Sequence, residues 1–368
     1  MIGSIIGVGV FGLPYAFAQS GLVIGLLELL LIGGLLLFLQ LMFAEIVVQT
    51  DGDHRIVGYV QQYLGKGWGK IAFIAVSCGV WGAMTAYIIV GGKFFSLLLS
   101  PILGGQDFVY SIIIAVVAAI FIYRGIGFVS KFEVVIVLAL IFLFIFIVSL
   151  SFPNIQISNF FTFHPTNAFV PYGVILFSMA GLGVVPEMRA VLGMKQERRL
   201  GHAILTAMAV IALLYSVFAI SVLGVSGSGT SQAAFDGLLP HLAPAAGIVA
   251  SLLGALTILS IFILLGIQLK NTLIFDFRLR EKTSWFLVVS VPIFLYLIGV
   301  RELIGLIGFV GSVFTGILGI LIVLSYLQMR KSPICRKHTC VLFPKPLAWM
   351  IVVLFAGGSL LQIFTVLF

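Results

Sequence analysis

Two hydrophobic segments contain glycine and proline where an uninterrupted helix would be expected. The first, GSIIGVGVFGLPYAF, begins at Gly3, and the second, FSMAGLGVVPEM, begins at Phe177. Glycine weakens a helix by about 1 kcal/mol and proline by about 3 kcal/mol, and proline also lacks a backbone donor. Both segments are therefore predicted to unwind and to expose backbone N–H and C=O groups, which bind ions and charged solutes. Close helix packing is the alternative, because Gly3 and Gly7 form a small-xxx-small pair.

Side chains able to perform acid–base or metal chemistry are scarce. The chain has five histidines, no HExxH sequence and no pair of carboxylates within a hydrophobic segment, which disfavours a membrane enzyme. Cys335, His338 and Cys340 in CRKHTC offer three soft ligands, but their spacing is poor for zinc. We interpret CRKHTC as a basic loop and predict no metal site. A channel would need a polar ring or stripe, and no hydrophobic segment carries one.

The composition indicates an all-α polytopic membrane protein whose main partner is the lipid bilayer. Hydrophobic residues make up 61% of the 368 residues, charged residues 9%, and the mean hydropathy is +1.26. Ordinary soluble domains carry about 25% charged residues. A run of roughly 18 apolar residues crosses a bilayer as a helix, and the chain has about eleven such runs. The predicted spans are 2–19, 22–48, 71–99, 108–124, 129–151, 170–188, 203–225, 245–269, 284–300, 303–328 and 347–367.

Basic residues alternate between the connections of these spans. Of the 20 Lys and Arg residues, all but Lys93 and Arg301 lie in every second connection. Because basic loops stay in the cytoplasm, the pattern predicts a cytoplasmic N-terminus, an extracytoplasmic C-terminus and an odd number of spans. The net charge of +8 is therefore interpreted as a topology signal and not as a nucleic-acid-binding surface.

The two interrupted segments lie in spans 1 and 6, which begin two halves of five spans each. We place these halves at 1–151 and 170–328, joined by an extracytoplasmic connection at 152–169 and followed by a cytoplasmic loop and a last span at 329–368. An odd number of spans in each half requires the second half to be inserted upside down relative to the first.

The glycine-to-proline spacing is the same in both halves. Pro14 follows Gly9 by five positions in the first half, and Pro186 follows Gly181 by five positions in the second. Matching interruptions at corresponding positions of two halves indicate the binding site of a transporter. We therefore expect a transported solute to bind where the two segments meet.

Two connections are expected to contain short helices. The connection 51–70 is aromatic and cytoplasmic and can hold an interfacial helix. The connection 226–244 faces outward, and we expect a short re-entrant or capping helix around Gln232–Leu239, with an ordinary surface loop as the alternative.

Both interrupted segments resemble motifs of a known family. GSIIGVGVFGLPYAFAQSG is similar to the first-helix signature of the amino acid/auxin permease family, which includes bacterial aromatic amino acid permeases. FSMAGLGVVPEM resembles the sixth-helix signature, with Phe177 four residues before Gly181. Weaker matches lie in spans 3 and 8, and the family belongs to the amino acid–polyamine–cation superfamily.

The resemblance implies both a fold and an activity. The fold is a five-plus-five inverted repeat, commonly of eleven spans, with discontinuous helices 1 and 6. The activity is secondary active amino acid transport by alternating access in a bacterial-type plasma membrane. A transporter of another small solute on the same fold, such as a nucleobase or an inorganic cation, is the alternative.

By the same resemblance, the substrate contacts backbone groups at both breaks. N–H groups of Val8, Gly9 and Val10, helped by the helix dipole, would face the carboxylate. Carbonyl groups of the unwound helix 6 would accept from the ammonium group, and nearby aromatic and methionine side chains would give specificity. The predicted substrate-binding residues are Gly7, Val8, Gly9, Val10, Phe11, Tyr87, Phe177, Ser178, Met179, Ala180 and Gly181.

The coupling ion is sodium or a proton, and no other cofactor is expected. In sodium-coupled relatives, helix 1 carbonyls and helix 8 hydroxyls hold the cation. Gly3 and Ile6 match the carbonyl positions, and Thr257 and Ser260 lie on one face of helix 8. Leu259 stands where the family often has a second hydroxyl, which favours a proton.

Ionisable residues within spans are candidates for proton coupling, and here these are Glu28, Lys93 and Glu187. Each also has a structural explanation, such as a Lys93 that reaches the membrane surface.

Helix 1 has few residues before its break. A break at the bilayer midplane needs about ten preceding helical residues at 1.5 Å each. Only six residues precede Gly7, so we expect the inner half of helix 1 to be incomplete in this sequence.

Overall fold

The computed structural model describes residues 1–52, 54–125, 133–193, 198–234, 244–275, 277–332 and 341–367. Within these ranges the regular elements are all helices, so the prediction of an all-α chain is confirmed. The CRKHTC sequence lies outside the described residues, and so does the helix expected around Gln232–Leu239 from residue 235 onward.

The helices follow the hydrophobic segments closely. They are α1 (Ile2–Ile5), α2 (Gly9–Ser20), α3 (Leu22–Gln49), α4 (Ile56–Leu64), α5 (Lys66–Leu103), α6 (Asp107–Arg124), α7 (Glu133–Ser151), α8 (Val170–Ser178), α9 (Val185–Leu192), α10 (Arg198–Ser226), α12 (Pro244–Phe275), α13 (Glu281–Leu297), α14 (Leu303–Phe309), α15 (Gly316–Met329) and α17 (Lys345–Leu367). Short 3-10 turns are η1 (Phe152–Asn154), η2 (Ile157–Phe160), η3 (Pro165–Asn167), η4 (Leu182–Val184) and η6 (Gly227–Gly229), and η8 (Val310–Thr315) is a π-helical segment. The short helix expected in the 51–70 connection is present as α4.

Eight helical stretches in the described ranges are long and apolar enough to cross a membrane. They are Leu22–Gln49, Lys66–Leu103, Asp107–Arg124, Val170–Leu192, Arg199–Gly229, Ala246–Ile274, Leu303–Met329 and Lys345–Leu367, and each overlaps a predicted span. The other three predicted spans contain shorter helices: span 1 is divided between α1 and α2, span 5 is described from Glu133 onward as α7, and span 9 contains the 17-residue α13. The total of eleven and the inverted repeat stay predictions.

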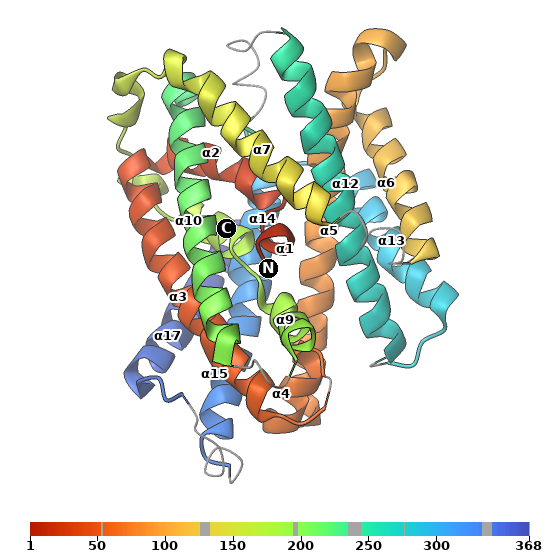
Figure 1. The fold of residues 1–368 in the computed structure, drawn as a ribbon, viewed down its shortest axis with the longest axis vertical. Coiled ribbons are helices and arrows are strands. Elements are labelled where there is room, and N and C mark those ends of the chain that lie inside the picture. The colour runs from red at the N-terminus through yellow and green to blue at the C-terminus, as the bar shows by residue number, and fades with distance from the viewer. Residues whose placement is uncertain are drawn as a thin grey trace.

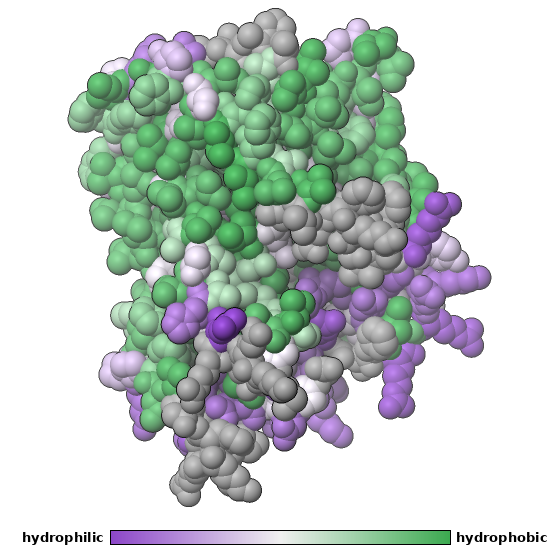
Figure 2. Space-filling model, viewed as in Figure 1, coloured by the Kyte–Doolittle hydropathy of each residue, from purple (hydrophilic) through white to green (hydrophobic). Residues whose placement is uncertain are grey.

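The surface of the molecule matches a lipid environment. Figure 2 shows apolar side chains covering most of the visible face, with hydrophilic side chains gathered toward one end. Large apolar residues that would be buried in a soluble protein are exposed here, such as Leu30 and Leu31 on α3. An apolar outer surface of this kind is stable against hydrocarbon and not against water. The chain is an α-helical membrane protein.

Both predicted discontinuities are present. α1 ends at Ile5, Ile6 takes an extended conformation, and α2 begins at Gly9. Pro14 lies inside α2, so the first break falls at the glycines that precede it. In span 6, α8 ends at Ser178 and helix resumes through η4 into α9.

The broken helices lie inside the bundle. α2 packs against α8, α10 packs against α1, α2, α3 and α9, and the long α5 packs against α12 and α6. Figure 1 places α1 and α9 near the middle of the view. Backbone that is free of helical hydrogen bonds is thereby kept away from lipid, as it must be at membrane depth.

Candidate functional site

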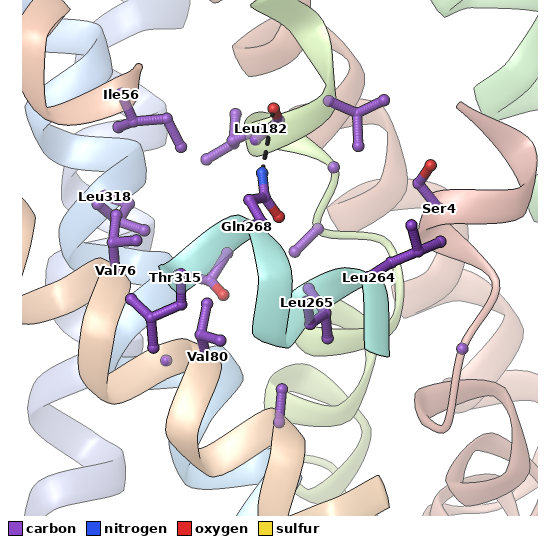
Figure 3. A pocket seen from close by; sticks show the side chains of 18 of the residues that line it. Ser4, Ile56, Val76, Val80, Leu182, Leu264, Leu265, Gln268, Thr315 and Leu318 are labelled. Atoms are coloured by element: carbon purple, nitrogen blue, oxygen red, sulfur yellow. Dashed lines mark hydrogen bonds between the residues drawn. The ribbon is translucent and has the colours of Figure 1, made fainter. Parts of the chain in front are cut away.

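A cavity of approximately 340 Å³ lies between the two broken helices. The walls come from the break in span 1, the break in span 6, α5, α12 and the π-helical segment with the start of α15. Figure 3 shows apolar side chains of α5 and α15, such as Val76, Val80 and Leu318, across from Leu264 and Leu265 of α12. The cavity is thus mainly apolar, with backbone polar groups at the breaks.

The break in span 1 contributes backbone donors. Gly7 and Gly9 line the cavity, and within the described residues their N–H groups make no hydrogen bond. The N–H of Val8 donates to the hydroxyl oxygen of Tyr87 at 3.2 Å, and that of Val10 donates to the Gly7 carbonyl at 3.4 Å. Of the three N–H groups predicted to face a carboxylate, only that of Gly9 is therefore free, and Gly7 adds a second one.

Glycine is required at both positions by close contacts. A Cβ atom at Gly7 would overlap the Tyr87 hydroxyl. A Cβ atom at Gly9 would lie 2.5 Å from the Ser178 Oγ and 2.8 Å from its Cα. Gly9 therefore allows span 1 to approach span 6. The same residue thus permits close helix packing and exposes its polar backbone.

The break in span 6 contributes backbone acceptors, several of which are already bonded. The Ser178 carbonyl accepts from the Tyr215 hydroxyl at 3.0 Å, and the Met179 carbonyl accepts from Gln40 Nε2 at 3.3 Å. The Gly183 carbonyl accepts from Gln268 Nε2 at 3.5 Å, the bond drawn in Figure 3. Among the described residues no donor reaches the carbonyl groups of Phe177 and Ala180, which both line the cavity.

Three polar side chains at the breaks were not predicted from the sequence. Gln40 and Tyr215 are fully buried, and Gln268 lines the cavity. Their signal in the sequence is an uncharged polar residue in the middle of an apolar run: LFLQLMF, ALLYSVF and LLGIQLK. Unwound carbonyls at membrane depth need donors, and such residues supply them.

The structure brings together only part of the predicted substrate site. Seven of its residues line the cavity: Gly7, Gly9, Tyr87, Phe177, Ser178, Ala180 and Gly181. Val8, Val10, Phe11 and Met179 do not. Phe11 is 3% exposed and packs edge-on against Phe94 and Phe218, with ring centroids 5.3 and 6.1 Å away. The apolar wall comes instead from residues of α5, α12 and η8, among them Ala83, Ile261 and Phe314.

None of the four predicted ion-coupling residues lines the cavity. Gly3 lies in α1 and Ile6 is fully buried just after it. Thr257 and Ser260 are buried in α12, and the Thr257 hydroxyl has no hydrogen-bond partner among the described residues. Within the same residues, no group of three or more His, Cys, Asp or Glu side chains is arranged to hold a metal ion.

The three candidates for proton coupling lie in different settings. Glu28 on α3 has one buried carboxylate oxygen without a hydrogen-bond partner in the described part of the chain. Lys93 lies within α5, away from the cavity lining. Glu187 lies at the cavity wall and forms an ion pair with Arg55.

The cavity reaches the molecular surface at the charged end of the molecule. Arg55 Nη1 and Glu187 Oε1 are 3.2 Å apart there, and their side chains are 44% and 47% exposed. Arg189 Nη1 also donates to the Thr50 carbonyl at 3.1 Å. Both contacts join α9, the second helix of the broken span 6, to the connection between α3 and α4.

Three comparisons with known proteins identify the fold and the family of this chain. The fold is similar to that of the crystal structure of MhsT in complex with L-phenylalanine, with a TM-score of 0.65 and 12% identity over 99% of this chain and 96% of that one. The tyrosine-specific transport system 1 of Haemophilus influenzae is 29% identical over 157 residues, which are 43% of this chain and 39% of the relative's length. The model of the tryptophan/tyrosine permease family matches residues 1–364. The chain therefore belongs to the tryptophan/tyrosine permease family.

Proposed function

We propose that the protein is a secondary active transporter of aromatic amino acids. The observation that carries this proposal is one cavity lined by residues of both broken helices. Within the described residues, the N–H groups of Gly7 and Gly9 and the carbonyl groups of Phe177 and Ala180 make no hydrogen bond there. Membership of the tryptophan/tyrosine permease family supports the substrate class.

The two breaks suit the two charges of an amino acid. Leaving water is costly for a charged group unless it is hydrogen-bonded. The N–H groups of Gly7 and Gly9 bind the carboxylate, and the Tyr87 hydroxyl, which also lines the cavity, adds a donor. The carbonyl groups of Phe177 and Ala180 accept from the ammonium group. These partners differ from the predicted set because Tyr87 and Tyr215 already bond the Val8 N–H and the Ser178 carbonyl.

The apolar wall suits an aromatic side chain. The cavity of approximately 340 Å³ falls within the range of small-molecule sites. Phe177 and the apolar residues of α5, α12 and η8 surround the part of the cavity beyond the backbone groups. A π-helical segment at a functional site is common, and here it directs Val310 and Phe314 to the cavity.

Transport proceeds by alternating access in this proposal. The basic end of the molecule is cytoplasmic, so the cavity that opens beside Arg55 and Glu187 represents an inward-facing state. The halves 1–151 and 170–328 form an inverted repeat, and their relative motion exposes the same site to the other side. The N-terminus is cytoplasmic and the C-terminus extracytoplasmic.

Uptake by the purified protein in liposomes tests this function. We expect saturable uptake of radiolabelled tryptophan, with competition by tyrosine and phenylalanine and none by lysine or glutamate. Uptake driven by an inward proton gradient in sodium-free buffer identifies a proton as the coupling ion, whereas uptake that requires a sodium gradient identifies sodium. Absence of saturable uptake of every aromatic amino acid contradicts the proposal. Uptake of a nucleobase or an inorganic cation instead supports the alternative.

A further inference from the structure

We propose that Tyr215 is a positioning residue that joins the two broken helices through its hydroxyl group and thereby sets the ammonium-binding half of the site. The inference rests on the proposed function and goes beyond it, because Tyr215 lies outside the cavity lining.

The Tyr215 hydroxyl lies between the ends of two helices. It is 3.0 Å from the carbonyl oxygen of Ser178 and 3.4 Å from that of Ile5. Ile5 is the last residue of α1, and Ser178 is the last residue of α8. Carbonyl groups at helix C-termini lack helical partners and carry partial negative charge. Two such ends directed at one point repel each other unless a donor lies between them.

The environment of Tyr215 makes its hydroxyl the available donor. The side chain is fully buried, and its helix α10 packs against α1, α2 and α9. The Ser178 hydroxyl donates back to the Val174 carbonyl at 2.6 Å and is thereby occupied. In the described part of the chain, the other side chains that hydrogen-bond to the breaks each bond to one of them: Tyr87 to span 1, and Gln40 to span 6. Among the described hydrogen bonds, only those of Tyr215 contact both.

A phenol has one proton, so Tyr215 donates fully to one carbonyl at a time. The shorter distance assigns this proton mainly to Ser178 in the present state. The bond fixes the Ser178 peptide group and, through the chain, the carbonyl groups of the neighbouring cavity-lining residues Phe177 and Ala180. The Ile5 carbonyl competes with the Ser178 carbonyl for the Tyr215 proton, and a displacement of α1 changes this competition. The position of α1 therefore influences how well the ammonium group is bound.

The test removes the hydroxyl and compares two ligands. Tyr215→Phe keeps the ring and deletes only the donor. Tryptophan carries both charges, whereas indole-3-propionate lacks the ammonium group. We expect the variant to bind tryptophan at least ten-fold more weakly, while inhibition by indole-3-propionate changes less than two-fold. Scintillation proximity binding, with radiolabelled tryptophan displaced by each compound, gives both affinities.

Tyr326→Phe is the matched control. Tyr326 is also fully buried, and its hydroxyl also makes two backbone hydrogen bonds, to the Val341 carbonyl and from the Phe343 N–H. We expect its substitution to leave both affinities within two-fold of the wild type. Tyr215→Met, which fills the same space with a flexible apolar chain, is expected to repeat the selective loss seen with Tyr215→Phe.

The outcomes separate this inference from the proposed function. Wild-type protein that fails to bind aromatic amino acids overturns the proposed function. Functional wild type with a Tyr215→Phe variant that binds tryptophan normally, or that loses both ligands equally, overturns the role of Tyr215. Failure of both Tyr215 variants to fold, judged by size-exclusion chromatography, also overturns it when Tyr326→Phe folds, because the hydroxyl is then needed for folding alone.

Discussion

Gly9 combines two requirements that no other residue type satisfies together. Its N–H lies free at the cavity, and its missing side chain leaves room for Ser178 of the facing helix. A larger residue would separate the two breaks by several tenths of an ångström or more, and donors and acceptors would no longer reach one substrate molecule. Substrate sites depend on such distances, because small misplacements of binding groups have large effects on rate.

We therefore expect Gly9→Leu to abolish uptake while the protein remains inserted in the membrane. Gly34→Leu is the control, since a Cβ atom at Gly34 would meet no atom of another part of the chain within 4 Å. Uptake of radiolabelled tryptophan, normalised to the amount of protein in the membrane fraction, measures the effect. Wild-type uptake by Gly9→Leu would show that the breaks need not lie close together for transport.

Backbone positions of the site were easier to predict from the sequence than its side chains. Three of the predicted glycines line the cavity, namely Gly7, Gly9 and Gly181. Glycine acts on the local backbone conformation, so its effect can be predicted from the sequence directly. The predicted role of Phe11 in specificity depends on which side of α2 faces the cavity, and this rotation is fixed by Phe94 and Phe218 on distant helices. The roles of Gln40 and Tyr215 likewise depend on packing between helices that are far apart in sequence.

At the scale of elements, the broken span 6 is held at both ends of its break. The carbonyls near the break are bonded by α3, α10 and α12 through Gln40, Tyr215 and Gln268. Its second helix, α9, is connected to the region between α3 and α4 by Arg55–Glu187 and by Arg189. The Gln40 and Tyr215 contacts are buried and position the break. The Arg189 bond is partly buried, whereas the Arg55–Glu187 pair is exposed and can exchange as α9 moves.

Reversal of the exposed pair tests this connection. Arg55→Glu and Glu187→Arg each place like charges together at the cavity mouth, and the double variant restores opposite charges. Exposed ion pairs contribute about 0.2–1 kcal/mol, so we expect each single variant to change the maximal uptake rate by about 1.4- to five-fold. The double variant is expected to return toward the wild-type rate. A double variant as impaired as the worse single one would show that the pair does not act as a link.

At the scale of the whole molecule, hydrophobicity and charge were sufficient to predict a helical membrane protein. Eight of the predicted spans are present as long apolar helical stretches. Their length could be predicted because the thickness of the bilayer sets the number of apolar residues that a spanning helix needs. The number of spans is harder to predict from hydropathy where helices are short or interrupted, as in α1 with α2 and in α13. The depth and opening of the cavity depend on how helices tilt and pack, which hydropathy does not encode.

The orientation of the whole bundle can be tested by labelling the two ends of α5. This helix runs from Lys66 to Leu103, about 57 Å at 1.5 Å per residue, which is enough to cross the bilayer. Lys66 at the basic end and Gln106 beyond the opposite end are both exposed. The chain has three cysteines, Cys78, Cys335 and Cys340, and their replacement by serine removes background labelling.

In this cysteine-free background we expect a membrane-impermeant maleimide to label Gln106→Cys on intact cells and to label Lys66→Cys only after permeabilisation. The reason is that basic loops remain on the cytoplasmic side during insertion, and the Lys66 end carries the basic residues. The two variants serve as controls for each other, because each must react under one condition. Labelling of Lys66→Cys on intact cells, with Gln106→Cys protected, would reverse the orientation and make the observed cavity outward-facing.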